Sequence, residues 1–316
     1  MTEMPAMNSP WLVSVWPGMG GVALKAGEYL AEQLGMTHVG DFPCDEFFDV
    51  NHLSVDEGLA RPGDRPRCAI LHWRDPRERN DLVLLMGEAQ PLTRGYELAH
   101  RVIEWAAEWQ VSRIFAFAAL ATQMHPGEPA RTFAAATTRQ LLGELEGLDL
   151  EILSEGQITG LNGLMVAAAQ AEGIDAACLL GEVPYFATQV ANPKASRVVL
   201  GAFGNLAGIE LDFMPLDAQA EEVDNHLIQL LDRMQQEARE SDEAAGEPWL
   251  ASGGEEGPQE GEGGEIDPEV EKRIERLFVE AARDRSRAFV LKRELDRLGV
   301  FEQYENRFLD LFTRGE

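Results

Sequence analysis

The sequence predicts an α/β protein in which a mostly parallel sheet carries helices on both faces. Three observations predict this fold class. The apolar runs at 82–86 and 114–120 are continuous, as in parallel strands that are buried on both faces. Segments with helical spacing of apolar residues alternate with these strand-like runs. A short apolar strand near the N-terminus leads through a glycine turn into a helix, which is the first unit of the alternation.

Each element follows from its local pattern along the chain. Strands are predicted at Leu12–Trp16, Leu82–Met86, Ile114–Leu120 and Ala176–Leu180, and helices at Val22–Leu34, Tyr96–Trp109, Thr137–Leu145, Leu164–Glu172 and Ala195–Leu206. The polar stretch between Asn51 and Trp73 contains Pro62-Gly63-Asp64, and it predicts a hairpin insertion.

Composition divides the chain near residues 239 and 265. Residues 240–265 contain nine acids, seven glycines and no Lys or Arg, too little apolar surface to offset the entropy cost of ordering. We therefore predict an α/β domain over 1–239 and an acidic flexible linker over 240–265, a specific acidic interaction motif being the alternative for the linker. Asp267-Pro268 then predicts a helix start, and helical spacing continues past Gly299, so residues 266–316 are predicted to form a helical module.

Charge and cysteine content exclude several classes. The chain has 27 Lys and Arg against 55 Asp and Glu, a net charge of −28, which disfavours nucleic-acid and membrane-surface partners. Its three cysteines have neither zinc-ligand spacing nor a disulfide-scaffold pattern, which favours a reducing compartment. The N-terminal residues do not resemble a signal peptide, so a cytoplasmic location is expected.

The first candidate ligand-binding residues are Gly18, Gly20 and Gly21, directly after the first strand. With Ala23 they fit a loose dinucleotide-binding pattern, and Asp41 follows where a ribose-binding acid is expected. The alternative is a tight strand-to-helix turn that needs glycine for its geometry alone.

Further candidates follow other predicted strands and turns. Glu88 and Gln90 come after the strand at 82–86, where they could hold a polar ligand, or could instead cap the next helix or bind backbone groups. Gly160 and Gly163 belong to a second glycine-rich turn, and Glu182 ends the strand near 180. Glu88 and Glu182 could converge as an acid/base pair.

Several reaction classes lack their motifs. There is no GxSxG nucleophile elbow and no phosphate-binding loop of the GxxxxGK[ST] type. The six histidines include no HExxH and no close pair, so no metal site is predicted, and no cofactor is predicted either.

These turns resemble the proteasome assembly chaperone 2 family over about Trp11 to Leu216. The resemblance rests on the segments at Trp16–Gly21, Asp81–Pro91, Gly156–Met165, Cys178–Phe186 and Pro193–Ser196. It implies a three-layer α/β/α sandwich similar to phosphorylase/hydrolase-like folds, and self-association as trimers or larger. In archaeal and eukaryotic relatives it implies a role in assembling proteasome α-rings.

The C-terminal residues depart from one feature of that family. Proteasome-binding relatives can end in a hydrophobic–Tyr–any tripeptide that docks between α-subunits, whereas this chain ends Phe312-Thr313-Arg314-Gly315-Glu316. Docking through such a tail is therefore not expected. The sequence favours a non-enzymatic, homo-oligomeric protein of the assembly-factor type. The alternative is a nucleotide or small-ligand binder, or an enzyme, with a crevice at the carboxyl ends of the strands.

Overall fold

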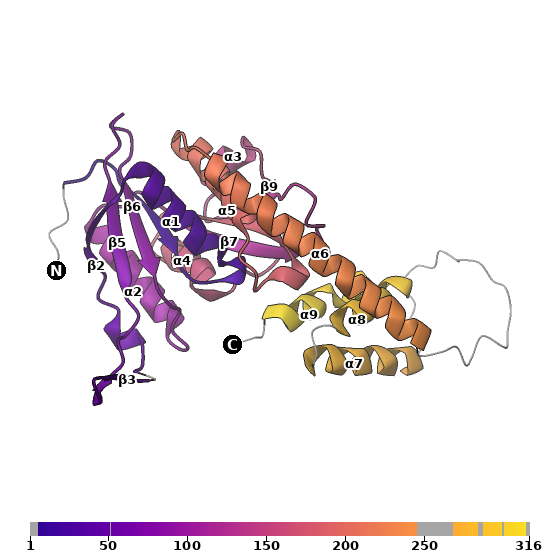
Figure 1. The fold of residues 1–316 in the computed structure, drawn as a ribbon. Helices are drawn as coiled ribbons and strands as arrows, with labels where there is room; N and C mark the ends of the chain where they lie inside the picture. Colours follow the sequence, from indigo (N-terminus) through magenta and orange to yellow (C-terminus); the bar gives the residue numbers. More distant parts are fainter. Residues whose placement is uncertain (1–5, 51, 245–267, 284–286, 299, 314–316) are drawn as a thin grey trace. The chain divides into compact units, whose positions relative to one another are not determined.

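The computed structural model describes residues 6–50, 52–244, 268–283, 287–298 and 300–313 (Figure 1). The chain divides into two compact units, Met1–Asp224 and Asn225–Glu316. One helix that the sequence did not predict, α6 (Met214–Ala244), crosses this division. Residues 240–244 of the predicted linker are the end of α6, and its residues 245–265 lie outside the described residues.

Eight strands of the first unit form one sheet in the order β2-β5-β6-β1-β7-β10-β8-β9. They are β1 (Trp11–Val15), β2 (Thr37–Asp41), β5 (Cys68–Trp73), β6 (Leu82–Gly87), β7 (Arg113–Thr122), β8 (Thr132–Ala136), β9 (Glu151–Ile152) and β10 (Asp175–Pro184). The central strands β6, β1, β7 and β10 are parallel to one another. Strands β5 and β8 join this centre in antiparallel orientation, so the sheet is mostly parallel, as predicted.

Helices cover both faces of the sheet, as the sequence predicted (Figure 1). They are α1 (Val22–Leu34), α2 (Gly95–Glu108), α3 (Arg139–Glu146), α4 (Gly160–Ala171) and α5 (Pro193–Ala207). Helices α1 and α5 pack together on one face, α2 and α4 on the other, and α3 packs near β8 and β9. The result is a three-layer α/β/α arrangement, which confirms the predicted fold class.

The alternation of side chains along the central strands builds both cores. On the α5 side, Phe115 and Phe117 of β7 contact Phe203 edge-on, with ring centroids 5.4 Å apart in each pair. On the opposite side, Ala116 and its neighbours pack against residues such as Met165 of α4. Burial of both faces explains why the central strands read as continuous apolar runs.

Local residues set where several helices start and stop. The Asn192 side chain accepts a hydrogen bond from the Ala195 amide at 2.9 Å, and Pro193 occupies the first helical position of α5. The Thr138 hydroxyl accepts one from the Leu141 amide at 3.3 Å and caps α3. Helix α4 begins at Gly160, four residues earlier than predicted, because the predicted turn is its first turn.

The region between Asn51 and Trp73 contains the predicted hairpin, but the hairpin is shorter than the region. Strands β3 (Leu53–Asp56) and β4 (Leu59–Pro62) pair as a separate two-stranded sheet. Glu57 and Gly58 have φ angles of 47° and 79° and form the two-residue turn between them. Residues 68–73 belong instead to β5 of the main sheet. The side chains of Cys68 and Ile70, two residues apart, are buried in the core, as expected for alternating side chains of a strand.

Helices α7 (Pro268–Arg283), α8 (Ala288–Arg297) and α9 (Phe301–Thr313) pack on one another in the second unit. Their shared core contains the buried residues Ile274, Phe278, Ala281, Leu291, Leu295, Phe308 and Phe312. The helical spacing in the sequence is thus confirmed. Asp267, at the predicted helix start, and Gly299 lie outside the described residues.

Candidate functional site

The β1–α1 turn is held against the loop that precedes α5. Gly20 and Gly21 have φ angles of 61° and 58°, in the left-handed region that favours glycine. The Gly20 amide donates to the Thr188 carbonyl at 2.6 Å, and the Gly20 carbonyl accepts from the Asn192 amide at 2.9 Å. A Cβ at Gly20 would lie 3.2 Å from Cβ of Asn192. Conformation and close approach therefore both require glycine at position 20.

Asn162, which sequence reasoning did not select, joins α4 to the same turn. Its side chain accepts a hydrogen bond from the Trp16 amide at 3.1 Å and donates one to the Trp16 carbonyl at 3.2 Å. The residue is only 4% exposed, so these bonds satisfy buried backbone groups where β1 has ended. A polar residue inside the apolar helical run Leu161–Met165 was the one hint of this role in the sequence.

Gln90 bridges the first and second glycine turns. Its amide donates to the Pro17 carbonyl, and its side-chain oxygen accepts from the Leu161 amide at 2.8 Å. The second bond satisfies a free amide at the start of α4. The sequence left open whether Gln90 holds a ligand or bonds to the chain itself. In the structure its side chain hydrogen-bonds to backbone groups.

The glycines of α4 allow close packing. A Cβ at Gly160, where φ is 73°, would lie 2.9 Å from the Gln90 side-chain oxygen. A Cβ at Gly163 would lie 2.1 Å from the Ile158 carbonyl oxygen, nearer than real Cβ atoms approach. Residues 16–21, Gln90 and residues 158–163, called the turn cluster below, are therefore brought together by hydrogen bonds and contacts within the chain.

Glu88 lies apart from this cluster, beside the segment that follows the hairpin. Its carboxylate accepts from the Arg67 amide at 2.9 Å and from the Arg67 guanidinium at 3.2 and 3.3 Å. Both side chains are at least half exposed. Such an exposed pair contributes at most about 1 kcal/mol to stability.

Glu182 is 1% exposed and lies at the end of β10. Its carboxylate accepts from the Arg131 guanidinium at 2.6 and 2.9 Å, from the Arg131 amide at 3.1 Å and from the Thr122 hydroxyl at 2.7 Å. Burial would raise the pKa of Glu182, but these hydrogen bonds outweigh it and lower the pKa from its ordinary value.

The structure does not bring Glu88 and Glu182 together. Glu88 follows β6 and Glu182 lies near the end of β10, and these two strands are separated in the sheet by β1 and β7. Three steps between neighbouring strands amount to roughly 14 Å. Each carboxylate has its own arginine, so the two lack the shared environment that an acid/base pair requires.

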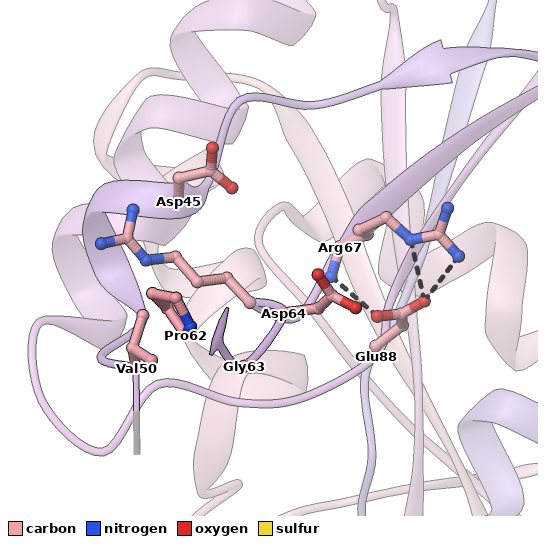
Figure 2. Close-up of a pocket in the computed structure, with 8 residues that line it drawn as sticks. Asp45, Val50, Pro62, Gly63, Asp64, Arg67 and Glu88 are labelled. Atoms are coloured by element: carbon pink, nitrogen blue, oxygen red, sulfur yellow. Dashed lines mark hydrogen bonds and ion pairs between the residues drawn. The ribbon is translucent and has the colours of Figure 1, made fainter. Parts of the chain in front are cut away.

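A groove of about 860 Å³ lies at the base of the hairpin, and Glu88 is the only predicted site residue that lines it. It is lined by Asp45, Val50, Pro62, Gly63, Asp64, Arg65, Arg67 and Glu88. Figure 2 shows Arg67 and Glu88 joined by hydrogen bonds on one side and Val50 and Pro62 on the other. The remaining predicted site residues lie in the turn cluster or, for Glu182, at the end of β10.

Among the described residues, no three His, Cys, Asp or Glu side chains are grouped closely enough to hold a metal ion. In those same parts of the chain, no helix combines the length and the apolar character that crossing a lipid bilayer requires.

Comparison with known families identifies the group to which the fold and these turns belong. A family model described as the PAC2 family matches residues 12–231, which is more than half of the chain. The chain belongs to the PAC2 family. The matched region contains all eight predicted site residues and excludes the helices α7, α8 and α9, so the resemblance seen in the sequence is confirmed for the α/β part.

One relative and two solved structures are similar to this chain over most of their own length. An uncharacterised protein of Methanocaldococcus jannaschii is 24% identical over 221 residues, 69% of this chain and 81% of that protein. Pyrococcus furiosus PbaB, an archaeal proteasome activator, is 24% identical with a TM-score of 0.61, covering 72% of this chain and 96% of PbaB. PbaA of the same organism, an archaeal homologue of proteasome-assembly chaperone, is 20% identical with a TM-score of 0.55, covering 76% of this chain and 95% of PbaA. Both solved structures share the fold of this chain.

Proposed function

We propose that this PAC2 protein is a homo-oligomeric assembly factor that works through protein–protein contacts and not through catalysis. Membership of the family supports the proposal, as does the shared fold with an archaeal proteasome activator and an assembly-chaperone homologue. The turn cluster supports it as well. Gln90 and Asn162, two polar side chains of the cluster, already hydrogen-bond to the backbone of the chain.

The exposed apolar hairpin is the observation that carries this proposal. All residues from 52 to 62 are exposed, and the hairpin, β3 and β4, forms a sheet of its own. Val50, Leu53, Val55 and Leu59 are 41%, 61%, 66% and 64% exposed. An isolated two-stranded hairpin is marginally stable in water, and exposed apolar patches mark interaction sites.

The pairing register collects apolar side chains on one face of this hairpin. Leu53 pairs with Pro62 and Val55 with Ala60, so these four side chains lie on the same face. Within the part of the chain that the structure describes, the sheet of the hairpin contains two strands, so neither outer edge is paired with a further strand. We infer that a second copy of the chain covers this face, with further copies giving the trimer or larger assembly.

The oligomeric state tests the proposal directly. Native mass spectrometry at micromolar concentration should show a trimer or larger for the wild type, and a shift toward monomer for the double variant Leu53→Ser, Val55→Ser. Leu92→Ser is the matched control, because Leu92 is 93% exposed but lies outside the hairpin. Unchanged melting at low concentration would show that the variants fold.

A wild-type protein that is monomeric at this concentration would contradict self-association. Equal assembly of the hairpin variant and the wild type would contradict the role of the hairpin. Because the same spectra weigh any co-purified protein, a proteasome-type partner would appear as an additional mass that the homo-oligomer does not explain.

Small-ligand binding is the second candidate, and the groove in Figure 2 favours it. The groove combines carboxylates, arginines and an apolar side, as ligand sites often do. Nucleosides, nucleotides and nicotinamide cofactors are the first probes. A ligand at about 100 times its Kd should stabilise the fold by about 2.7 kcal/mol, and Arg67→Ala should weaken that effect. No change in melting with any of these probes would contradict this candidate.

A further inference from the structure

Two cysteines that are distant in the sequence meet at the base of the hairpin. Cys44 precedes the short helix η2 (Asp45–Phe47), and Cys68 is the first residue of β5. The Phe42 amide donates to the Cys68 carbonyl at 2.8 Å, which aligns the two segments. The thiols hydrogen-bond to each other, and the Cys44 thiol also donates to the Pro66 carbonyl at 3.7 Å. Cys44 is 2% exposed and Cys68 is fully buried, within one apolar cluster.

We infer that Cys44 and Cys68 form an oxidisable dithiol site that closes to a disulfide beneath the hairpin. The site does not depend on self-association or on ligand binding. The disulfide would enclose residues 45–67, which contain β3, β4 and every residue of the groove lining except Glu88.

The environments of the two thiols assign them different roles. The hydrogen bond from Cys68 lowers the pKa of Cys44 from its ordinary value, even though burial opposes this. The same hydrogen bond, together with burial, raises the pKa of Cys68. The thiolate is the reactive form of cysteine, and Cys44 is also the more exposed of the two thiols, at 2% against 0% for Cys68, so we assign Cys44 the attacking role and Cys68 the resolving one.

A peroxide, the class of oxidant small enough to reach a buried thiol, gives a balanced reaction. Cys44 loses its proton, and the resulting thiolate attacks one peroxide oxygen. The O–O bond breaks, the leaving hydroxide takes up the proton that Cys44 released and becomes water, and a sulfenic acid is left at Cys44. The Cys68 sulfur then attacks the Cys44 sulfur, an S–S bond forms, and the departing hydroxyl takes the Cys68 proton as water. Two thiols are oxidised to a disulfide, and one hydrogen peroxide is reduced to two waters.

Cys178 is the control thiol within the same chain. It is fully buried, and burial raises its pKa to about 12, so it has almost no thiolate at neutral pH. Among the described residues, the structure gives it no thiol neighbour.

Thiol counting after hydrogen peroxide treatment of the full chain tests the inference. All three cysteines are free at the start, so unfolding in iodoacetamide should label three sites before oxidation and one, Cys178, afterwards. Peptide mapping should find Cys44 linked to Cys68 within one chain, and a reductant should restore all three labels. In Cys68→Ser, dimedone should trap a sulfenic acid at Cys44.

Other outcomes of the wild-type experiment would overturn the inference, whether or not the variant folds. These are three labelled cysteines after peroxide, loss of Cys178 at the same rate as the pair, oxidation of Cys44 to sulfinic acid without a link, or a link between two chains.

Discussion

The turn cluster and the hairpin belong to the same α/β unit, but they differ in how far the chain itself provides contacts for their side chains. In the turn cluster, the buried Asn162 side chain satisfies both backbone groups of Trp16, and Gln90 links two further segments. In the hairpin, every residue is exposed, including the apolar side chains of Leu53, Val55 and Leu59. Both regions stand out in the sequence as breaks in the regular alternation, yet only one is complete within the chain.

This difference indicates which region stabilises the fold and which region is suited to contact a partner. A buried polar side chain that is hydrogen-bonded to backbone groups of its own chain stabilises the fold, and those bonds would have to break before the same atoms could hold a ligand. An apolar side chain left in water gains free energy when another surface covers it, about 25 cal/mol for each Å². We therefore expect a partner to bind at the hairpin and not at the glycines of the turn cluster.

The largest effect on stability should come from Asn162→Ala. It would leave the Trp16 amide and carbonyl buried without partners, each costing about 1–3 kcal/mol, so we expect a loss of about 3 kcal/mol or more. The free energy of unfolding, measured by urea titration, checks this.

Gln170→Ala is the matched control for that variant, because Gln170 is exposed on the same helix. It should change stability by no more than about 0.5 kcal/mol. Similar losses in the free energy of unfolding for Asn162→Ala and Gln170→Ala would contradict the stabilising role of the Asn162 hydrogen bonds in the turn cluster.

An intermediate effect is expected at Glu182, and it should depend on pH. The pKa of Glu182 is lowered from 4.5 in the folded chain, so its contribution is complete above 4.5 and is lost as the pH falls through the folded value. Glu182→Gln should cost about 2 kcal/mol at neutral pH through weaker bonds to Arg131 and Thr122. The difference from wild type should shrink as the pH falls below 4.5.

Urea titrations of both proteins at several pH values measure this difference. Glu88→Gln serves as the control at another strand end, where the pair with Arg67 is exposed, and it should cost less than about 1 kcal/mol. A Glu182→Gln difference that stays constant through acid pH would contradict the stabilising role of its ionised form.

The sequence predicted the four central strands of the sheet but not the four outer ones. The four central strands are buried on both faces: β1, β6, β7 and β10. This burial gives continuous apolar runs in the sequence, and these runs were enough to predict the strands. Strand β2 has mostly exposed or half-exposed residues, and β8 is rich in alanine, which has no preference for strands. Helix α6 was not predicted, because its polar residues outnumber its apolar ones.

The candidate site was predictable in its positions more than in its chemistry. The glycines at 20, 160 and 163 do mark segments that meet, because close approach requires them. A Cβ at Gly18 would make only an ordinary contact, 3.6 Å from the Asn162 side chain. The spacing of the glycines could not show what approaches them, which is the protein's own backbone and the Gln90 side chain. The meeting of Cys44 and Cys68 was equally hidden, since it depends on the pairing of β2 with β5.

The smallest effect should distinguish two adjacent glycines of the turn cluster. Gly21 has a left-handed φ but nothing within 4 Å of a new Cβ, so Gly21→Ala should cost only the conformational strain, about 1–2 kcal/mol. Gly20→Ala adds the contact at 3.2 Å with Asn192, and it should cost more. Thermal unfolding of the two variants measures the difference, which is the part due to packing. Equal losses would mean that the loop before α5 moves aside freely, and the turn would then have room for a ligand that the packed arrangement denies it.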